Sequence, residues 1–277
     1  MVQVNELYEK YIKKESLPTL FCPGCGNGIV QFAAIKAFEK MGIKDDLACV
    51  SGIGCSSWIP CYFKMDVMHT MHGRALPFAE GLKLSRPDKK ILVFSGDGDC
   101  LAIGGNHLIH AASRNIDLTV IEINNYIYGM TGGQKSPATP EGSVTKTSPF
   151  GSYDEPIDGC SLVAAAGGTY VARWTTAHPV QLEKAIAEGI RHKGFSFIEV
   201  LTQCPVQAGK NIFGEKSPVA MMARYKEMTY IYKEGMEIPE GKVRIGKIKH
   251  DTSRKEYTEK VLQKLEEKNI KKGQSNG

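Results

Sequence analysis

The chain has 277 residues, of which 42% are hydrophobic and 23% charged, and its formal net charge is +5. This size and composition are typical of a globular α/β protein with one large domain or a domain with an appendage. The net charge is small, and Lys and Arg are scattered along the chain, which argues against nucleic acid as a partner. No apolar run approaches the 18 residues that would indicate a membrane span.

The N-terminal segment, "MVQVNELYEKYIKKESLP", is polar and carries charges of both signs. It resembles neither a signal peptide nor a transit peptide. Eight cysteines in a chain without an export signal are expected to be reduced thiols or metal ligands rather than disulfides. We therefore expect a cytoplasmic location.

The first motif is "FCPGCGNG" at residues 21–28, in which Cys22 and Cys25 form a Cys-x-x-Cys pair between Pro and Gly residues. Such a pair serves as a redox dithiol, as half of a zinc site, as part of an iron–sulfur site, or as two buried thiols without chemistry. The local sequence leaves these four interpretations open.

Strand-like and helix-like segments alternate after this motif. A helix is predicted over residues 28–41, with Gly42 as its C-cap. Short apolar runs indicate buried strands at residues 47–52, 91–96, 118–125, 169–174 and 195–202. Helical segments are expected between them, near residues 101–114, 160–167 and 179–193. This alternation predicts an α/β fold with a doubly wound, mainly parallel sheet.

Ligands of such sheets bind at the carboxyl ends of the strands. Three predicted strands end in unusual sequence, namely "GIGCSS", "GDGD" and "NNYIYGMTGGQ". A long segment rich in Pro, Gly, Ser and Thr follows at residues 131–158, and a loop of this length is usually functional or disordered. The charged tail at 251–272 is typical of a solvated or partner-covering helix.

Asp97, in "GDG", and Asn125 follow two consecutive predicted strands, so their side chains should meet at one edge of the sheet. A carboxylate and an amide oxygen suit Mg²⁺, which prefers oxygen ligands. Gly96 and Gly98 allow the backbone to approach a phosphate, and the helix after Asp99 directs its positive end toward an anion. "GDG" alone would be no more than a turn, whereas the pair with Asn125 predicts Mg²⁺ and a diphosphate.

This spacing resembles the thiamine diphosphate fingerprint, and "HGRALPFAEGLKLSRPDKKILVFSGDGD" is similar to the diphosphate-binding domain of thiamine-dependent enzymes. Together with it, "CPGCGNG", "GIGCSS", "NNYIYGMTGGQ" and "TQCP" resemble the β subunit of 2-oxoacid:ferredoxin oxidoreductases. The resemblance covers residues 17–209. "IGGNHLIHAASRNIDLTVIEINN" and "YVARWTTAHP" are most similar to the 2-oxoglutarate:ferredoxin (2-oxoglutarate synthase) branch.

The resemblance implies the residues of each site. Mg²⁺ would be bound by the side chains of Asp97 and Asn125 and by the carbonyl of Ile127. Contacts to the diphosphate and thiazolium would come from Ile53, Gly54, Cys55, Ser56, Gly98, Asp99, Gly129 and Met130. A [4Fe–4S] cluster would be bound by Cys22, Cys25, Cys55 and Cys204. Spacing alone indicates only Cys22 and Cys25 as metal ligands. Without the resemblance, Cys55 and Cys204 could equally be small buried side chains.

The remaining candidates are less specific. Cys49, Cys61, Cys100 and Cys160 are interpreted as core residues. His72 would reach the thiazolium or the substrate carboxylate and Arg74 would pair with an anionic substrate, although a structural histidine is an equally good interpretation of His72. Trp58 stands where some relatives with other substrates have Lys, which fits a dicarboxylate substrate without proving it.

The implied activity is the oxidative decarboxylation of 2-oxoglutarate with coenzyme A to succinyl-CoA and CO₂, with electrons passing through the cluster to ferredoxin. Residues 1–209 would form the domain that binds thiamine diphosphate and Mg²⁺. This domain would also carry the cluster ligands, the first two of them in an N-terminal cluster-binding segment. Residues 210–277 would form a partner-contacting extension. The chain is too short for both halves of a thiamine site, so an α subunit should supply the pyrimidine-binding domain. The resemblance also allows separate γ and ferredoxin-like δ subunits as partners.

Three alternatives remain at this point. The same chemistry could act on pyruvate or a branched-chain 2-oxoacid. The chain could be a cluster-free thiamine diphosphate 2-oxoacid decarboxylase half, or a zinc-bound assembly subunit without activity.

Overall fold

The structure, a computed structural model, describes residues 4–232, 236–237 and 239–275. The helices are α1 (Val4–Tyr11), α2 (Asn27–Met41), α3 (Trp58–Cys61), α4 (Ala75–Ser85), α5 (Gly105–Arg114), α6 (Gly159–Ala166), α7 (Pro179–Arg191), α8 (Pro218–Met228) and α9 (Tyr257–Ser275). The strands are β1 (Leu47–Ser51), β2 (Asp66–His69), β3 (Lys90–Gly96), β4 (Thr119–Asn124), β5 (Ile127–Tyr128), β6 (Gln134–Lys135), β7 (Tyr170–Thr175), β8 (Ser196–Leu201), β9 (Thr229–Ile231) and β10 (Val243–His250).

Eight strands form one sheet in the order β2-β1-β3-β4-β8-β7-β10-β9. Neighbouring strands are parallel except for β10, which runs antiparallel to β7. The sheet extends in both directions from β3. Strands β1 and β2 lie on one side of β3, and β4 and β8 lie on the other. This confirms the predicted doubly wound, mainly parallel α/β fold.

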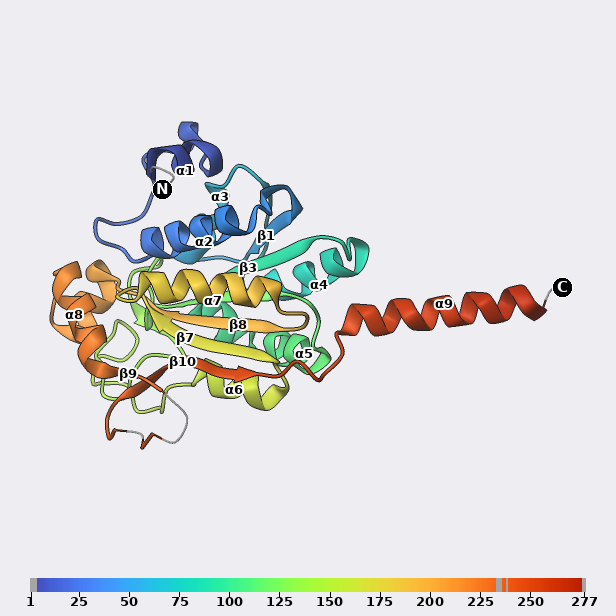
Figure 1. Cartoon of the computed structure of the whole chain (residues 1–277). Coiled ribbons are helices and arrows are strands. Elements are labelled where there is room, and N and C mark those ends of the chain that lie inside the picture. Colours follow the sequence, from blue (N-terminus) through green and yellow to red (C-terminus); the bar gives the residue numbers. More distant parts are fainter. Residues whose placement is uncertain (1–3, 233–235, 238, 276–277) are drawn as a thin grey trace.

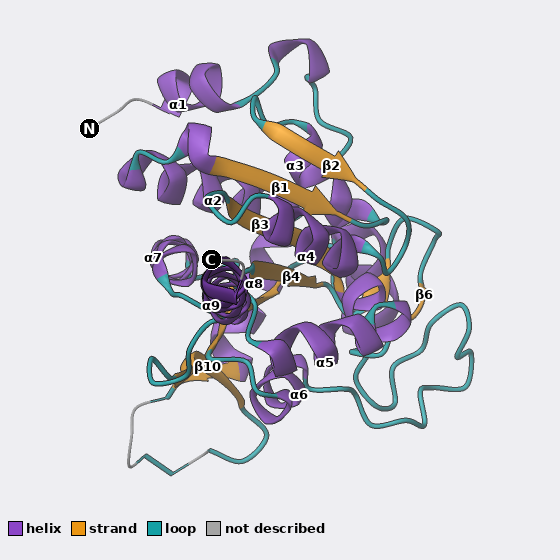
Figure 2. Cartoon of the chain, turned by 90° about the vertical axis from the view of Figure 1, so that its right-hand side faces the viewer, coloured by secondary structure: helices purple, strands orange, loops and turns teal. Residues whose placement is uncertain are grey.

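Helices cover both faces of the sheet (Figure 2). One core contains residues of α1, α2, α3 and α7 packed on the sheet, and the other contains residues of α4, α5 and α6. The five central strands β1, β3, β4, β7 and β8 are buried almost throughout, which explains why they appear in the sequence as continuous apolar runs.

Most of the predicted elements are present. Helix α2 ends at Gly42 in the left-handed conformation, as expected for a C-cap. The segment predicted as one helix near residues 101–114 is instead a π-helical turn, Gly98–Ile103, followed by α5. Helix α4, the edge strands β2 and β9, and β10, which lies between β7 and β9, were not predicted from the sequence.

The segment after residue 209 contributes to the same sheet, because β10 pairs with β7. Helix α9 begins at Tyr257 and extends away from the rest of the molecule (Figure 1). Its first turn is held at the C-terminal end of α5, where Glu256 accepts a hydrogen bond from the backbone N–H of Asp117 at 2.9 Å. Within the described residues, no helix is long and apolar enough to cross a membrane.

Candidate active site

The carboxyl ends of β1, β3 and β4 meet at one edge of the sheet and enclose a cavity of about 120 Å³. Three loops line it, at residues 53–56, 97–99 and 125–131, and His72 closes one side. The lining includes every residue predicted to contact the cofactor: Ile53, Gly54, Cys55, Ser56, Gly98, Asp99, Gly129 and Met130. It also includes the three predicted Mg²⁺ ligands Asp97, Asn125 and Ile127.

Asp97 is almost completely buried at the end of β3, and its Oδ2 accepts a hydrogen bond of 2.5 Å from the Oγ of Ser136. Burial raises the pKa of this carboxyl group to about 7. A cation in the cavity would offset that desolvation and favour the ionised form. The side chains of Asp97 and Asn125 supply oxygen donors of the hard type that Mg²⁺ prefers, so the donor set fits the ion.

The loop after β4 has a tight backbone turn. Tyr126 has φ 65°, which is uncommon for a residue other than glycine. The side-chain oxygens of Asn124 and Asn125 accept hydrogen bonds from the N–H groups of Tyr126 and Ile127, at 3.0 and 3.2 Å. The two asparagines therefore hold the turn that directs Ile127 and Met130 into the cavity wall.

Gly98 allows an aromatic ring to lie directly against the backbone. A Cβ at Gly98 would be 2.1 Å from the ring of Tyr128, and the Tyr128 hydroxyl donates to the Gly98 carbonyl at 3.2 Å. Tyr128 lines the same cavity and contacts His72 edge to face, with ring centroids 6.2 Å apart. Glycine is therefore required here for side-chain packing as well as for approach of a phosphate.

Asp99 and His72 form a direct pair on the cavity wall. The Nδ1 of His72 lies 2.5 Å from the Oδ1 of Asp99, whose carboxylate is buried. Arg74, in contrast, does not line the cavity: its guanidinium donates to the carbonyls of Gly73 and Ile103, at 3.2 and 3.3 Å. The two residues proposed from the sequence as catalytic are thus in different positions, and only His72 is at the cavity.

A second cavity of about 330 Å³ adjoins the first, and all four predicted cluster ligands line it: Cys22, Cys25, Cys55 and Cys204. Burial, together with the proximity of other cysteines of this set, raises the pKa of Cys25 to about 12 and that of Cys55 to about 11. Burial likewise raises the pKa of Cys204. Four thiols around one cavity form a donor set that fits a [4Fe–4S] cluster, whose iron would favour the thiolates.

The two cavities share a wall. Cys55, Asn125, Gly129 and Met130 line both of them. Gly129 keeps this wall thin, because a Cβ there would lie 3.5 Å from the Sγ of Cys55 and 3.7 Å from that of Cys204. The loop after β1 thus contributes to the cofactor cavity and to the cysteine cavity at once.

The other cysteines lie outside both cavities. Cys49, Cys100 and Cys160 are buried, as predicted, whereas Cys61 is partly exposed and its Sγ donates to the Ser57 carbonyl at 3.4 Å. His69 has its Nδ1 3.1 Å from the Oγ of Ser51, which supports a structural role.

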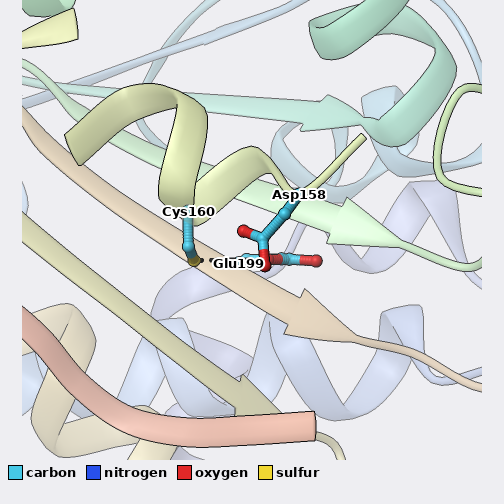
Figure 3. Close-up of side chains that lie close together, drawn as sticks. All are labelled: Asp158, Cys160 and Glu199. Atoms are coloured by element: carbon cyan, nitrogen blue, oxygen red, sulfur yellow. Dashed lines mark hydrogen bonds between the residues drawn. The ribbon is translucent and has the colours of Figure 1, made fainter. Parts of the chain in front are cut away.

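Asp158, Cys160 and Glu199 form a separate cluster between the start of α6 and the central strand β8, with ligand atoms within 4.8 Å of one another (Figure 3). The positive charge that these carboxylates face is the guanidinium of Arg173. Arg173 donates to Asp158 at 2.8 Å and to Glu199 at 2.7 Å, and it is 7% exposed. We therefore interpret the cluster as a buried ion-pair network rather than a metal centre.

Two residues that matter to the site were not predicted. Ser136 and Thr139 lie in the segment 131–158, and the hydroxyl of Thr139 donates to the Tyr126 carbonyl at 2.6 Å. Both are buried, so this segment packs against the cavity loops. The composition of the segment indicated function or disorder, but nothing local indicated which of its hydroxyls reach the site.

Comparison with known proteins agrees with this geometry. The family model of the thiamine pyrophosphate enzyme C-terminal TPP-binding domain matches residues 52–200. The 2-oxoglutarate synthase subunit KorB of Methanothermobacter marburgensis is 51% identical over 95% of this chain and 94% of its own length. That of Methanocaldococcus jannaschii is also 51% identical, over 94% of this chain and 97% of its own length.

A solved structure is similar as well. The 2-oxoglutarate:ferredoxin oxidoreductase of Magnetococcus marinus, determined with 2-oxoglutarate, coenzyme A and succinyl-CoA bound, matches with a TM-score of 0.86. Its identity is 30%, and the match covers 94% of this chain and 90% of that one. The chain thus belongs to the thiamine diphosphate-dependent 2-oxoacid:ferredoxin oxidoreductase family, as a subunit of the 2-oxoglutarate synthase KorB type.

Proposed function

We propose that this chain is the β subunit of a 2-oxoglutarate:ferredoxin oxidoreductase, which converts 2-oxoglutarate and coenzyme A to succinyl-CoA and CO₂ and passes the electrons to ferredoxin. The observation that carries the proposal is the shared wall between the two cavities, at Cys55 and Gly129. A cofactor that generates electrons and an acceptor that takes them one at a time must lie close together, and this wall would place them so.

Thiamine diphosphate would be anchored in the first cavity through Mg²⁺ held by Asp97, Asn125 and the Ile127 carbonyl. When bound, it supplies an electron sink for decarboxylation of a 2-oxoacid. This chain's contribution is to bind and orient the diphosphate end, since Gly98 and the backbone around Ser56 line the cavity without bulky side chains.

A [4Fe–4S] cluster would be held by Cys22, Cys25, Cys55 and Cys204 in the second cavity. The cluster supplies one-electron transfer when bound. Leu20, which lines this cavity, is 70% exposed, so the cavity reaches the surface where an electron acceptor arrives. The acceptor is ferredoxin in this proposal.

In this proposal the site is incomplete in this chain alone, because the described residues form one α/β domain around a single large sheet, and the family model that matches is that of one TPP-binding domain. An α subunit would supply the pyrimidine-binding domain and most of the substrate pocket, and separate γ and ferredoxin-like δ subunits would complete some assemblies. The division at residue 209 and a partner-contacting role for residues 210–277 belong to the same proposal, as does a cytoplasmic location.

The choice of 2-oxoglutarate over pyruvate or a branched-chain 2-oxoacid is supported by the KorB relatives and the Magnetococcus marinus enzyme. Trp58, which lines the cysteine cavity and stacks on His69, offers no charge to a substrate carboxylate. The distal carboxylate would accordingly be recognised by the partner subunit.

The test is copurification of this chain with its partner subunits under anaerobic conditions, followed by analysis of iron, acid-labile sulfide and thiamine diphosphate. Viologen reduction with coenzyme A should depend on 2-oxoglutarate and be weak with pyruvate or branched-chain 2-oxoacids. A complex that binds thiamine diphosphate and decarboxylates a 2-oxoacid without iron would instead establish the cluster-free alternative.

A further inference from the structure

The backbone turn at residues 128–133 forms part of the mouth of the cofactor cavity. Its first four residues line the cavity, and the tip of the turn is exposed to solvent. The backbone N–H groups of Gly132 and Gly133 donate to the carbonyls of Gly129 and Tyr128, at 3.2 and 2.9 Å. These two bonds close the turn and fix its shape.

Lys146 lies across this turn. Its backbone N–H donates to the Gly133 carbonyl at 2.9 Å, and the preceding residue, Thr145, is buried, so the backbone of Lys146 is held against the turn. A Cβ at Gly132 would be 2.5 Å from the Nζ of Lys146. Gly132 has φ 107°, a conformation that favours glycine, and its missing side chain leaves the space that the ammonium group occupies.

The charge of Lys146 is not neutralised by this chain. The residue is exposed, and its ammonium group has no ion-pair or hydrogen-bond partner in the part of the chain that the structure describes. Lys135, on the same side of the turn in sequence, differs in this respect because it forms an ion pair with Asp154. Lys146 is therefore a positive charge that is held beside the cavity mouth and is available to an anion.

We infer that Lys146 binds the distal carboxylate of 2-oxoglutarate and shares its recognition with the partner subunit. The inference rests on the proposed function, in which Gly129 and Met130 contact the cofactor and the substrate reacts beyond them. Gly132 follows Met130 by two residues, so their Cα atoms are at most about 7.6 Å apart. Only two methylene groups separate the reacting carbonyl of 2-oxoglutarate from its distal carboxylate, which suits this short distance.

The phosphates of coenzyme A are the other substrate oxyanions that an ammonium group could bind. The whole pantetheine arm separates them from the reacting thiol. Lys146, in contrast, lies on a turn whose neighbouring residues line the cofactor cavity. Its position therefore favours the carboxylate, and the kinetics with each substrate distinguish the two.

The experiment uses the assembled, anaerobically purified enzyme with the variants Lys146→Met and Lys146→Arg, and Lys135→Met as the matched control. The kcat and KM are measured for 2-oxoglutarate, for coenzyme A, and for 2-oxopentanoate, which has the same carbon chain without the distal carboxylate. Binding of glutarate, a dicarboxylate of the same length that lacks the reactive carbonyl, is measured by titration calorimetry. This last measurement does not depend on turnover.

We expect Lys146→Met to lower kcat/KM for 2-oxoglutarate, mainly through KM, and to weaken glutarate binding, each by about 10- to 100-fold, because a hydrogen bond to a charged group is lost. The kinetics with 2-oxopentanoate and the KM for coenzyme A should not change. Lys146→Arg should retain most of the affinity, because the positive charge remains. Added salt should raise the KM for 2-oxoglutarate more in the wild type than in Lys146→Met, since salt screens exposed charges.

Equal losses with 2-oxoglutarate and 2-oxopentanoate would show a general disturbance of the site and overturn the assignment. A higher KM for coenzyme A with an unchanged KM for 2-oxoglutarate would overturn it in favour of the phosphates. Wild-type kinetics and glutarate binding in Lys146→Met would overturn it while leaving the proposed function intact. A wild-type enzyme that does not oxidise 2-oxoglutarate would remove both.

Discussion

Cys55 and Cys204 are 149 positions apart in the chain, yet the sulfur atoms of both lie beside Gly129. A Cβ added at Gly129 would be 3.5 Å from the Sγ of Cys55 and 3.7 Å from the Sγ of Cys204. The fold brings them together because Cys55 follows β1, Cys204 follows β8, and the Gly129 loop follows β4, all at one edge of the sheet. A cluster at this point would be held by three separate parts of the chain.

The first prediction concerns Cys204→Ser. We expect this change to abolish most of the iron and acid-labile sulfide, because a neutral hydroxyl is a poor ligand for iron. Thiamine diphosphate binding should persist, since Cys204 does not line the cofactor cavity. Cys61→Ser is the control: Cys61 lies outside both cavities, and a serine preserves its hydrogen bond to Ser57. Wild-type iron content in Cys204→Ser would exclude this residue as a ligand.

The second prediction concerns Asp97→Ala, which removes the carboxylate expected to hold Mg²⁺. Thiamine diphosphate affinity, measured by calorimetry with and without Mg²⁺, should fall by at least about 10²-fold, while iron content remains. Ser136→Ala is a graded comparison, because it removes only the donor to Asp97 and should cost about 1 kcal/mol of binding or less. Mg²⁺-dependent binding that survives Asp97→Ala would contradict the assigned role.

A third prediction follows from the packing of Tyr128 on Gly98. Gly98→Ala would place a methyl group 2.1 Å from the ring, so the tyrosine must move and the cavity wall with it. We expect weaker thiamine diphosphate binding and a thermal midpoint lower by several degrees. In Gly105→Ala the new methyl group meets nothing within 4 Å, and a helical alanine should be neutral or stabilising. Equal behaviour of the two variants would show that Tyr128 tolerates displacement.

The fourth prediction concerns Glu122, which is fully buried on β4 with neither carboxylate oxygen hydrogen-bonded in the described structure. Burial, and next the charge of Glu199, raise its pKa well above the ordinary value of 4.5. The folded protein therefore retains a proton that the unfolded chain releases. The stability this group contributes is complete below about pH 4.5 and falls as the pH rises toward the folded pKa.

Glu122→Gln removes this dependence, because the amide cannot ionise. The variant should gain on the wild type as the pH rises above 4.5, by up to about 1.4 kcal/mol per pH unit. Thermal unfolding of both proteins over a pH series measures the difference, with exposed Glu141→Gln as the control. A constant difference across the series would show that Glu122 is ionised in the folded protein.

The fold and half of the site were predictable from the sequence because their signals are local. Buried parallel strands appear as apolar runs, and the spacing of Asp97 and Asn125 places both at adjacent strand ends. Cys55 and Cys204 required a family resemblance, since their partners lie far away in the chain. The bonds of Ser136 to Asp97 and of His72 to Asp99 could not be predicted, because the loops that carry them are positioned by packing. The edge strand β2 was missed because none of its residues is fully buried. Strand β10, between β7 and β9, was missed because only two of its residues are buried, so it does not appear as an apolar run.

The most direct test of the central claim is low-temperature electron paramagnetic resonance of the anaerobically assembled enzyme before and after addition of 2-oxoglutarate. The account predicts a signal of a reduced [4Fe–4S] cluster that appears with 2-oxoglutarate, requires thiamine diphosphate, and is absent from both Asp97→Ala and Cys204→Ser. An enzyme that binds thiamine diphosphate and releases CO₂ from 2-oxoglutarate while its cysteine cavity holds no iron would contradict it.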